Sequence, residues 1–279
     1  MNHLFATVAF GLAASLCWGS GDFTGGLASR KANTSSVVLA DYAVGFVLMV
    51  VLALLWREPF PAPVDLLWGG LAGVAGVLGL LAFYTALSSG KMGIAAPVSA
   101  VLTAALPVLF SAITTGLPTL LQLLGFVLAL LAIGLISRPE RAAGAQAGIW
   151  LAVLAGCGFG CFFILISRVQ PTATFWPLAA SRLSSVLFLF IVMRLRGQTI
   201  SLNRAVAPLV PLAGTLDAIG NAFFVLAAHS GRLDVAAVLS SLYPAATVLL
   251  AALILRERVT RVQGVGVLLA LLAIPCISA

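Results

Sequence analysis

The sequence predicts an all-α polytopic membrane protein, with ten transmembrane helices arranged as two inverted five-helix repeats. Three observations support this fold class: the composition, the spacing of apolar blocks and an internal repeat. The 279-residue chain is 62% hydrophobic and only 8% charged, whereas about a quarter of the residues of a soluble domain are charged. A chain with so little polar surface does not fold as a soluble protein.

Ten apolar blocks of about 20 residues follow one another, and each is long enough to cross a hydrocarbon core roughly 30 Å thick. The connections are short and contain helix breakers such as Pro61, Gly90 and Gly197. The first block continues to Arg30 without a cleavage site, so we expect a helix there and not a signal peptide. The predicted spans are 4–28, 36–56, 66–88, 92–115, 118–137, 146–167, 174–195, 206–228, 233–255 and 260–278.

The two halves of the chain, 1–141 and 142–279, resemble each other at an offset of roughly 141 positions. Ser89-Gly90 recurs as Ser230-Gly231, Gln122 as Gln263, and Gly125 as Gly266. Each half holds five spans, and an odd number makes the second half enter the membrane in the opposite sense. This inverted repeat is typical of transporters that bind substrate near the midplane between their halves.

Basic residues gather in the odd-numbered connections, which the positive-inside rule assigns to the cytoplasm. Both termini are then expected on the opposite side of the membrane. The net charge of +7 comes from residues scattered at the span ends and not from a basic patch, so no nucleic-acid partner is expected. The residues in the odd connections are Arg30, Lys31, Lys91, Arg138, Arg141, Arg194, Arg196, Arg204, Arg256, Arg258 and Arg261.

Four charged residues lie inside predicted spans and away from the span ends: Asp22, Asp41, Arg182 and Asp217. A charge at the centre of a membrane helix costs about 2.5–3.5 kcal/mol, so each one requires a partner or a function. Pairing Arg182 with one of the carboxylates would lower the cost of burying both. A static structural pair and the lining of a wet substrate cavity both explain these residues. Asn221 lies one turn after Asp217 and shares its helix face.

Other candidate site residues are aromatic or hydroxyl-bearing. Trp18 and Tyr243 are expected either to stack on a substrate or to act as interfacial anchors. Pro97, Pro107 and Pro244 lie inside spans, where each removes a backbone hydrogen bond and bends the helix, either as part of a gate or as a simple structural kink. The candidate substrate-binding residues are Trp18, Ser20, Asp22, Tyr84, Ser99, Arg182, Asp217, Asn221, Ser240 and Tyr243.

The closing segment, 239–274, resembles that of EamA-type members of the drug/metabolite transporter superfamily. The similarity rests on a Ser/Tyr-Pro stretch, a Glu followed by a basic residue and Thr, and a Gly-bearing last helix: Ser240, Pro244, Glu257, Thr260 and Gly266. WGSGDF, at 18–23, is similar to the start of the family pattern in the first helix. The first half departs from it, because Gly116 stands where the repeat would place Glu257.

The resemblance implies export of small metabolites across the bacterial inner membrane, most similar to exporters of aromatic or neutral amino acids. Together with the inverted repeat, it predicts a secondary transporter that works by alternating access through a central cavity. Its partners would be a small-molecule substrate and the lipid bilayer, and two repeats in one chain are compatible with a monomer.

Two other classes of function remain as alternatives. An intramembrane enzyme would need a nucleophile and a base, for which Ser20 and His229 are the candidates, although no spacing connects them. A non-transporting membrane scaffold would leave the buried charges without a function. No metal-ligand cluster, phosphate loop or other cofactor motif is present in the sequence, so neither a metal nor a cofactor is expected.

Overall fold

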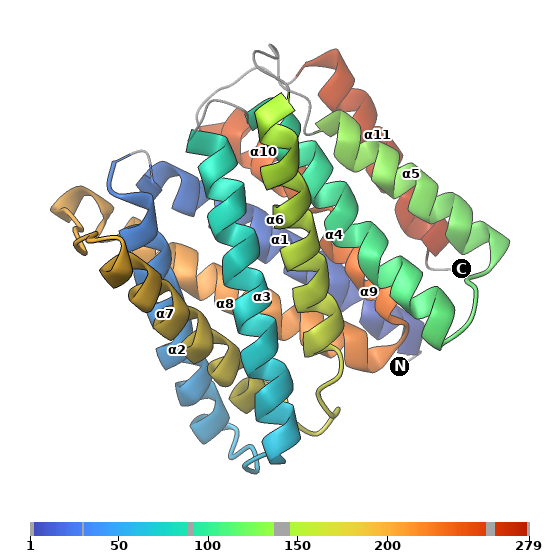
Figure 1. The fold of residues 1–279 in the computed structure, drawn as a ribbon. Helices are drawn as coiled ribbons and strands as arrows, with labels where there is room; N and C mark the ends of the chain where they lie inside the picture. Colours follow the sequence, from blue (N-terminus) through green and yellow to red (C-terminus); the bar gives the residue numbers. More distant parts are fainter. Residues whose placement is uncertain (1–2, 30, 89–91, 137–145, 255–259, 278–279) are drawn as a thin grey trace.

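The computed structural model describes residues 3–29, 31–88, 92–136, 146–254 and 260–277, and within these ranges every regular element is a helix (Figure 1). For 84–88, 92–97, 146–149 and 251 only the backbone is described. The α-helices are α1 (His3–Ser29), α2 (Thr34–Leu55), α3 (Pro63–Ser88), α4 (Met92–Thr114), α5 (Leu120–Ile136), α6 (Gln146–Ile166), α7 (Phe175–Leu195), α8 (Leu209–Ser230), α9 (Leu233–Ser240), α10 (Tyr243–Ile254) and α11 (Arg261–Ile277), with a 3₁₀ turn, η1 (Arg204–Val206), before α8.

Equivalent helices of the two halves start with the same polar motif. Before α5, the Thr119 amide donates to Gln122 Oε1, and the Gln122 amide donates to Thr119 Oγ1. Thr260 and Gln263 repeat both bonds before α11. Such reciprocal bonds satisfy two amides that a helix start otherwise leaves unpaired. The recurrence of Gln122 as Gln263 therefore reflects a shared capping box.

The predicted ninth span is two helices and not one. α9 ends at Ser240 and α10 begins at Tyr243, so the break falls directly before Pro244. A proline cannot donate the next helical hydrogen bond and crowds the preceding turn, which accounts for the interruption at this point. By contrast, α4 continues without a break through the positions of Pro97 and Pro107. The side chain of Pro97 lies outside the described residues.

The helix pairs with the most extensive packing each have an equivalent pair, in which both helices are replaced by their counterparts from the other half. α1 packs on α8 in the same way that α3 packs on α6, and α2 on α8 corresponds to α3 on α7. α4 packs on α6, and its counterparts α9 and α10 both pack on α1. α2 contacts its own counterpart α7, and α5 contacts α11. The two halves are therefore interleaved in one bundle, with extensive contacts between them (Figure 1).

The contact between α5 and α11 is reciprocal at the level of single residues. A methyl group added at Gly125 would lie 2.9 Å from the amide nitrogen of Ile277. One added at Gly266 would lie 2.9 Å from the amide nitrogen of Ile136. Glycine at both positions lets the two backbones approach closely, as in other membrane helix pairs.

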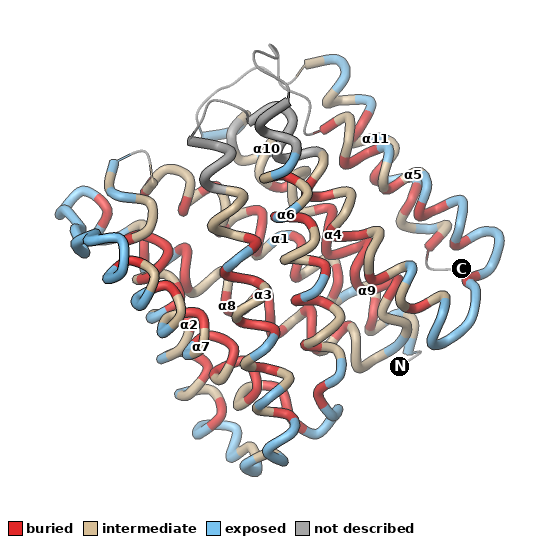
Figure 2. Tube along the Cα trace, in the orientation of Figure 1, coloured by how far each residue is buried: buried red, intermediate tan, exposed pale blue. Residues whose placement is uncertain are grey.

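The surface of the bundle is apolar, and the buried residues face its interior (Figure 2). Large apolar side chains are exposed, among them Leu54, Trp150, Leu195 and Leu253. So much exposed apolar surface is unfavourable in water but favourable in contact with lipid. Among the described residues, six helices are long and apolar enough to span a membrane: His3–Ser29, Thr34–Leu55, Pro63–Phe83, Phe175–Leu195, Leu209–Ser230 and Leu233–Ile254, the last counted across the break. The shorter apolar helices are Val98–Thr114, Leu120–Ile136, Trp150–Ile166 and Arg261–Ile277.

Candidate functional site

A cavity of about 120 Å³ lies between the halves of the bundle, enough for a small metabolite or several water molecules. Helices α1, α2, α3 and α4 line it from the first half, and α6, α7, α8 and α10 from the second. The side chains that give the cavity its chemical character are Trp18, Asp22, Asp41, Tyr42, Phe83, Thr103, Phe159, Phe162, Phe163, Ser181, Arg182, Ser185, Asp217, Asn221 and Tyr243.

An ion pair between α7 and α8 forms the polar wall of the cavity. Arg182 Nη1 donates to Asp217 Oδ2, and the guanidinium lies over the ring of Tyr42, 4.9 Å from its centroid. The Arg182 side chain is 1% exposed, whereas that of Asp217 is 33% exposed. The predicted pairing of Arg182 with a carboxylate is therefore confirmed, and the partner is Asp217. Both residues line the cavity, and the carboxylate is the more exposed member of the pair.

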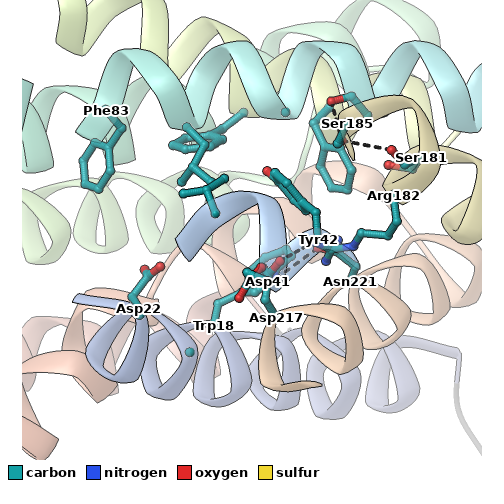
Figure 3. A pocket seen from close by; sticks show the side chains of 18 of the residues that line it. Trp18, Asp22, Asp41, Tyr42, Phe83, Ser181, Arg182, Ser185, Asp217 and Asn221 are labelled. Atoms are coloured by element: carbon teal, nitrogen blue, oxygen red, sulfur yellow. Dashed lines mark hydrogen bonds and ion pairs between the residues drawn. The ribbon is translucent and has the colours of Figure 1, made fainter. Parts of the chain in front are cut away.

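Two further carboxylates, Asp22 on α1 and Asp41 on α2, face the same cavity (Figure 3). Both are half-buried, and neither has a hydrogen bond or an ion pair with any other described residue. Each is close enough to Asp217 to repel it. Within the described part of the chain, no group of three such side chains converges closely enough to hold a metal ion. The carboxylates are thus distributed around the cavity.

Aromatic side chains form another part of the lining. Trp18 stacks on Phe163 with ring centroids 5.4 Å apart, and Phe163 stacks on Phe224 at 4.1 Å. Trp18 Nε1 donates to Asn221 Oδ1 at 3.1 Å, so the indole is held both by stacking and by a hydrogen bond. Fixed aromatic faces of this kind can pack against an apolar body or a cation.

The cavity extends toward the end of the bundle where α1 and α3 end and α2 begins, because Gly25, Val37 and Phe83 belong to its lining. These are the odd-numbered connections. The cavity therefore reaches toward the end of the bundle that the loop charges predict to be cytoplasmic.

Hydrogen bonds tie the halves together at the other end of the bundle. The carboxylate of Glu58, in the α2–α3 connection, accepts from the amides of Thr174 and Phe175 at the start of α7, both at 2.9 Å. Asp65 Oδ1 accepts from the amide of Gln170 at 3.0 Å. A carboxylate at a helix N-terminus is favoured both by the free amides and by the helix dipole.

A second ion pair lies at this same end. Arg232 Nη2 donates to Asp234 Oδ2 at 2.7 Å and to the Gly116 carbonyl at 2.8 Å, which joins the α8–α9 and α4–α5 connections. The hydrogen bond to Asp234 raises the pKa of Arg232, so the guanidinium is charged. Here the carboxylate is completely buried and the arginine is 31% exposed, the reverse of the first pair.

Comparison with known proteins gives the family. The model of the EamA-like transporter family matches residues 5–138 and again residues 146–279. The chain belongs to the EamA-like transporter family. It is therefore a multi-pass membrane protein from a family of small-molecule transporters, with a two-repeat architecture. No curated protein matches the sequence significantly.

A solved structure described only as "Crystal structure of protein" has the same fold as this EamA-like chain. Its TM-score is 0.78, with 16% sequence identity over 97% of this chain and 95% of that one.

The structure brings six of the ten candidate site residues to the cavity, namely Trp18, Asp22, Arg182, Asp217, Asn221 and Tyr243. Three serines lie elsewhere. Ser240 is buried and donates to the Gly11 carbonyl, and the carbonyls of Ser20 and Ser99 accept from threonines one turn later. The side chain of Tyr84 lies outside the described residues. Ser20, Ser99 and Ser240 belong to helices that contribute to the bundle interior, but the sequence does not indicate whether their side chains face the cavity.

No described contact joins Ser20 and His229, the candidate nucleophile and base of the enzyme alternative. His229 Nε2 interacts with the Val169 carbonyl at 2.9 Å, and Ser20 does not line the cavity.

The residues that sequence reasoning missed are mainly aromatic. Phe159, Phe162 and Phe163 come from an apolar stretch of α6 that resembles any lipid-facing helix. One signal could have found two of them, because the repeat offset relates Trp18 to Phe159 and Asp22 to Phe163. A residue facing the interior in one half predicts its counterpart in the other.

Proposed function

We propose that this protein is a secondary transporter that moves small organic metabolites through the central cavity by alternating access. The observation that carries the proposal is the cavity itself, which both halves enclose and which contains charged and aromatic side chains at membrane depth. Intramembrane charges are costly and are typical of substrate pathways. A scaffold would not need two carboxylates without partners facing an internal space.

The repeat supplies the moving parts. Ten spans, five in each half and opposite in orientation, would place two similar structural units on either side of the cavity. The exchange of packing partners between α1–α8 and α3–α6 supports this arrangement, since inverted halves are related by a pseudo-two-fold axis. Rocking of one half against the other would then close the cavity at one end and open it at the other.

The direction of transport follows from the two ends of the bundle. The cavity extends toward the predicted cytoplasmic face, and the bonds of Glu58 and Asp65 tie the halves together at the other end. This is the state expected to load substrate from the cytoplasm. Export across the bacterial inner membrane would require these bonds to break as the far end opens.

Neutral and aromatic amino acids are the substrate class that the family resemblance implies. The stacked rings of Trp18 and Phe163 support a substrate with an aromatic or apolar body, because such a body gains both area burial and ring–ring contact. We therefore propose small metabolites with an aromatic or apolar body as substrates, with neutral and aromatic amino acids among the compounds to be tested.

Reconstitution into liposomes tests the proposed function. Liposomes loaded with a panel of radiolabelled amino acids and amines should release at least one of them faster than protein-free liposomes. Trp18→Ala removes a ring of the cavity wall and should slow this efflux by an order of magnitude. Trp150→Ala removes a ring that is 74% exposed on the lipid face and should leave the rate unchanged. Efflux at the protein-free rate across the whole panel would refute transport.

A further inference from the structure

We propose that the cavity selects aromatic amines, that is, organic cations without a carboxylate, over the amino acids with the same side chain. This inference rests on the proposed transport function and names the substrate class of the same site. It is carried by three features of the described residues: the balance of charge, the sealed position of the single guanidinium, and the placement of carboxylates beside aromatic rings.

On the cavity walls, carboxyl groups outnumber the single guanidinium by three to one. The ionisable groups on its walls are Asp22 from α1, Asp41 and Tyr42 from α2, Arg182 from α7, Asp217 from α8 and Tyr243 from α10. When the three carboxylates are ionised, one guanidinium leaves them with two uncompensated charges. In a region of low dielectric such an excess attracts either protons or a cationic ligand.

Arg182 is not available to a ligand's carboxylate. Its side chain is 1% exposed, and its Nε and Nη2 atoms are buried without a hydrogen-bond partner. A methyl group added at Gly45 would lie 3.3 Å from Nε, which shows how closely the α2 backbone covers that side. The remaining nitrogen is bound to Asp217. An incoming carboxylate could reach this cation only if Arg182 first left Asp217.

The three carboxylates, in contrast, are accessible. Asp22, Asp41 and Asp217 are each partly exposed and line the space that a ligand would occupy. They do not converge as metal ligands do, because oxygen ligands must come within about 2.0–2.6 Å of an Mg²⁺ or Ca²⁺ ion. A distributed set of carboxylates fits a larger, softer cation whose charge can face more than one of them.

The aromatic wall completes the match. Trp18 and Phe163 line the same cavity as Asp22. Aromatic rings beside carboxylates bind ammonium groups through both cation–π and Coulomb attraction. An aromatic amine would offer an ammonium to the carboxylates and a ring to the wall. The corresponding amino acid would add a negative charge among accessible groups that are themselves acids.

Matched ligand pairs test the proposal directly. Tryptamine and tryptophan, and phenethylamine and phenylalanine, differ only in the carboxylate. Efflux from proteoliposomes should be at least tenfold faster for each amine at equal internal concentration, after subtraction of the rate in protein-free liposomes. Equal rates, or faster efflux of the amino acids, would overturn the selectivity while leaving transport intact. If neither member of either pair moves faster than in protein-free liposomes, and no other compound does, transport itself fails.

Two variants assign the selectivity to its residues. Asp22→Asn and Asp41→Asn each remove one accessible charge and should reduce the amine-to-amino-acid rate ratio at least threefold. Asp65→Asn removes a carboxylate outside the cavity and should leave the ratio unchanged. Because the ratio compares two ligands in the same proteoliposomes, it is independent of how much of each variant folds. An unchanged ratio in both cavity variants would overturn the assignment.

Discussion

Replacing Asp217 by leucine should destabilise the protein more than replacing Arg182 by methionine, because the two members of this ion pair differ in burial. Loss of Asp217 leaves a guanidinium that is 1% exposed without a hydrogen-bond partner among the described residues, which costs about 3–5 kcal/mol. Loss of Arg182 leaves a carboxylate that is 33% exposed and can be solvated in the cavity, at about 1–2 kcal/mol. In Arg182→Met the loss of the contact with Tyr42 costs a further ~1 kcal/mol or less, so Asp217→Leu is still the more destabilising of the two variants.

The second ion pair provides an internal control, because its burial is reversed. Asp234 is completely buried, whereas Arg232 is 31% exposed. Arg232→Met leaves a buried carboxylate whose one remaining donor among the described residues is the Val235 amide, so here the loss of arginine should cost more than Asp234→Leu. A general intolerance of arginine loss, or of aspartate loss, would give the same order in both pairs.

The measurement is unfolding of the purified protein in mixed micelles of dodecyl maltoside and increasing SDS, followed by circular dichroism. The double variant Arg182→Met/Asp217→Leu should recover to within about 1 kcal/mol of Arg182→Met alone, since an apolar pair of similar volume is often tolerated. The reasoning is refuted if the order of the two single variants is the same in both ion pairs.

Three other predictions concern the end ties, the packing and the cavity charge. Glu58→Ala removes the carboxylate that caps α7, at about 1–2 kcal/mol, and should shift the population five- to thirty-fold toward conformers open at that end; thiol labelling from outside of Ser181→Cys, in a background without native cysteines, should accelerate accordingly. Gly125→Ala should lower the free energy of unfolding by about 1–3 kcal/mol through its clash with Ile277, whereas Gly134→Ala on the same helix, with open space around it, should not lower it. The affinity for tryptamine should fall as the pH is lowered from about 8 to about 5, because protons compete with the ammonium for the cavity carboxylates while the amine stays charged; isothermal titration calorimetry would show the opposite trend if a carboxylic acid donated to the ligand.

The helices and the repeat were predictable because they depend on hydrophobic length and on periodic identity. Gln122 and Gln263 could be matched from the sequence, although only the structure shows that both close a capping box. The sequence could not predict that the helix is interrupted before Pro244, since a proline at position 107 leaves α4 continuous. Whether a proline bends or ends a helix depends on what its neighbours offer to the freed carbonyl.

The charged residues of the site could be predicted from the sequence, whereas most of its aromatic residues could not. A charge inside an apolar span is conspicuous, so Asp22, Arg182 and Asp217 could be identified one by one. The choice of Asp217 as the partner of Arg182 could not, because it depends on how α7 and α8 pack. Phe163 carries no signal of its own, since a phenylalanine facing lipid and one facing a cavity read identically in sequence.

The reciprocal contact between Gly125 and Ile277, and between Gly266 and Ile136, is the geometry of an isologous interface, in which one surface meets a copy of itself. Two separate five-helix chains of identical sequence could form the same contact. They would, however, have to carry every cavity residue twice. In this protein the counterpart of Asp41 is Arg182, that of Asp217 is Gly76, and that of Asp22 is Phe163. Joining the halves in one polypeptide thus allows the two walls to differ, so that only the second half contributes the cation while both halves contribute acids and rings.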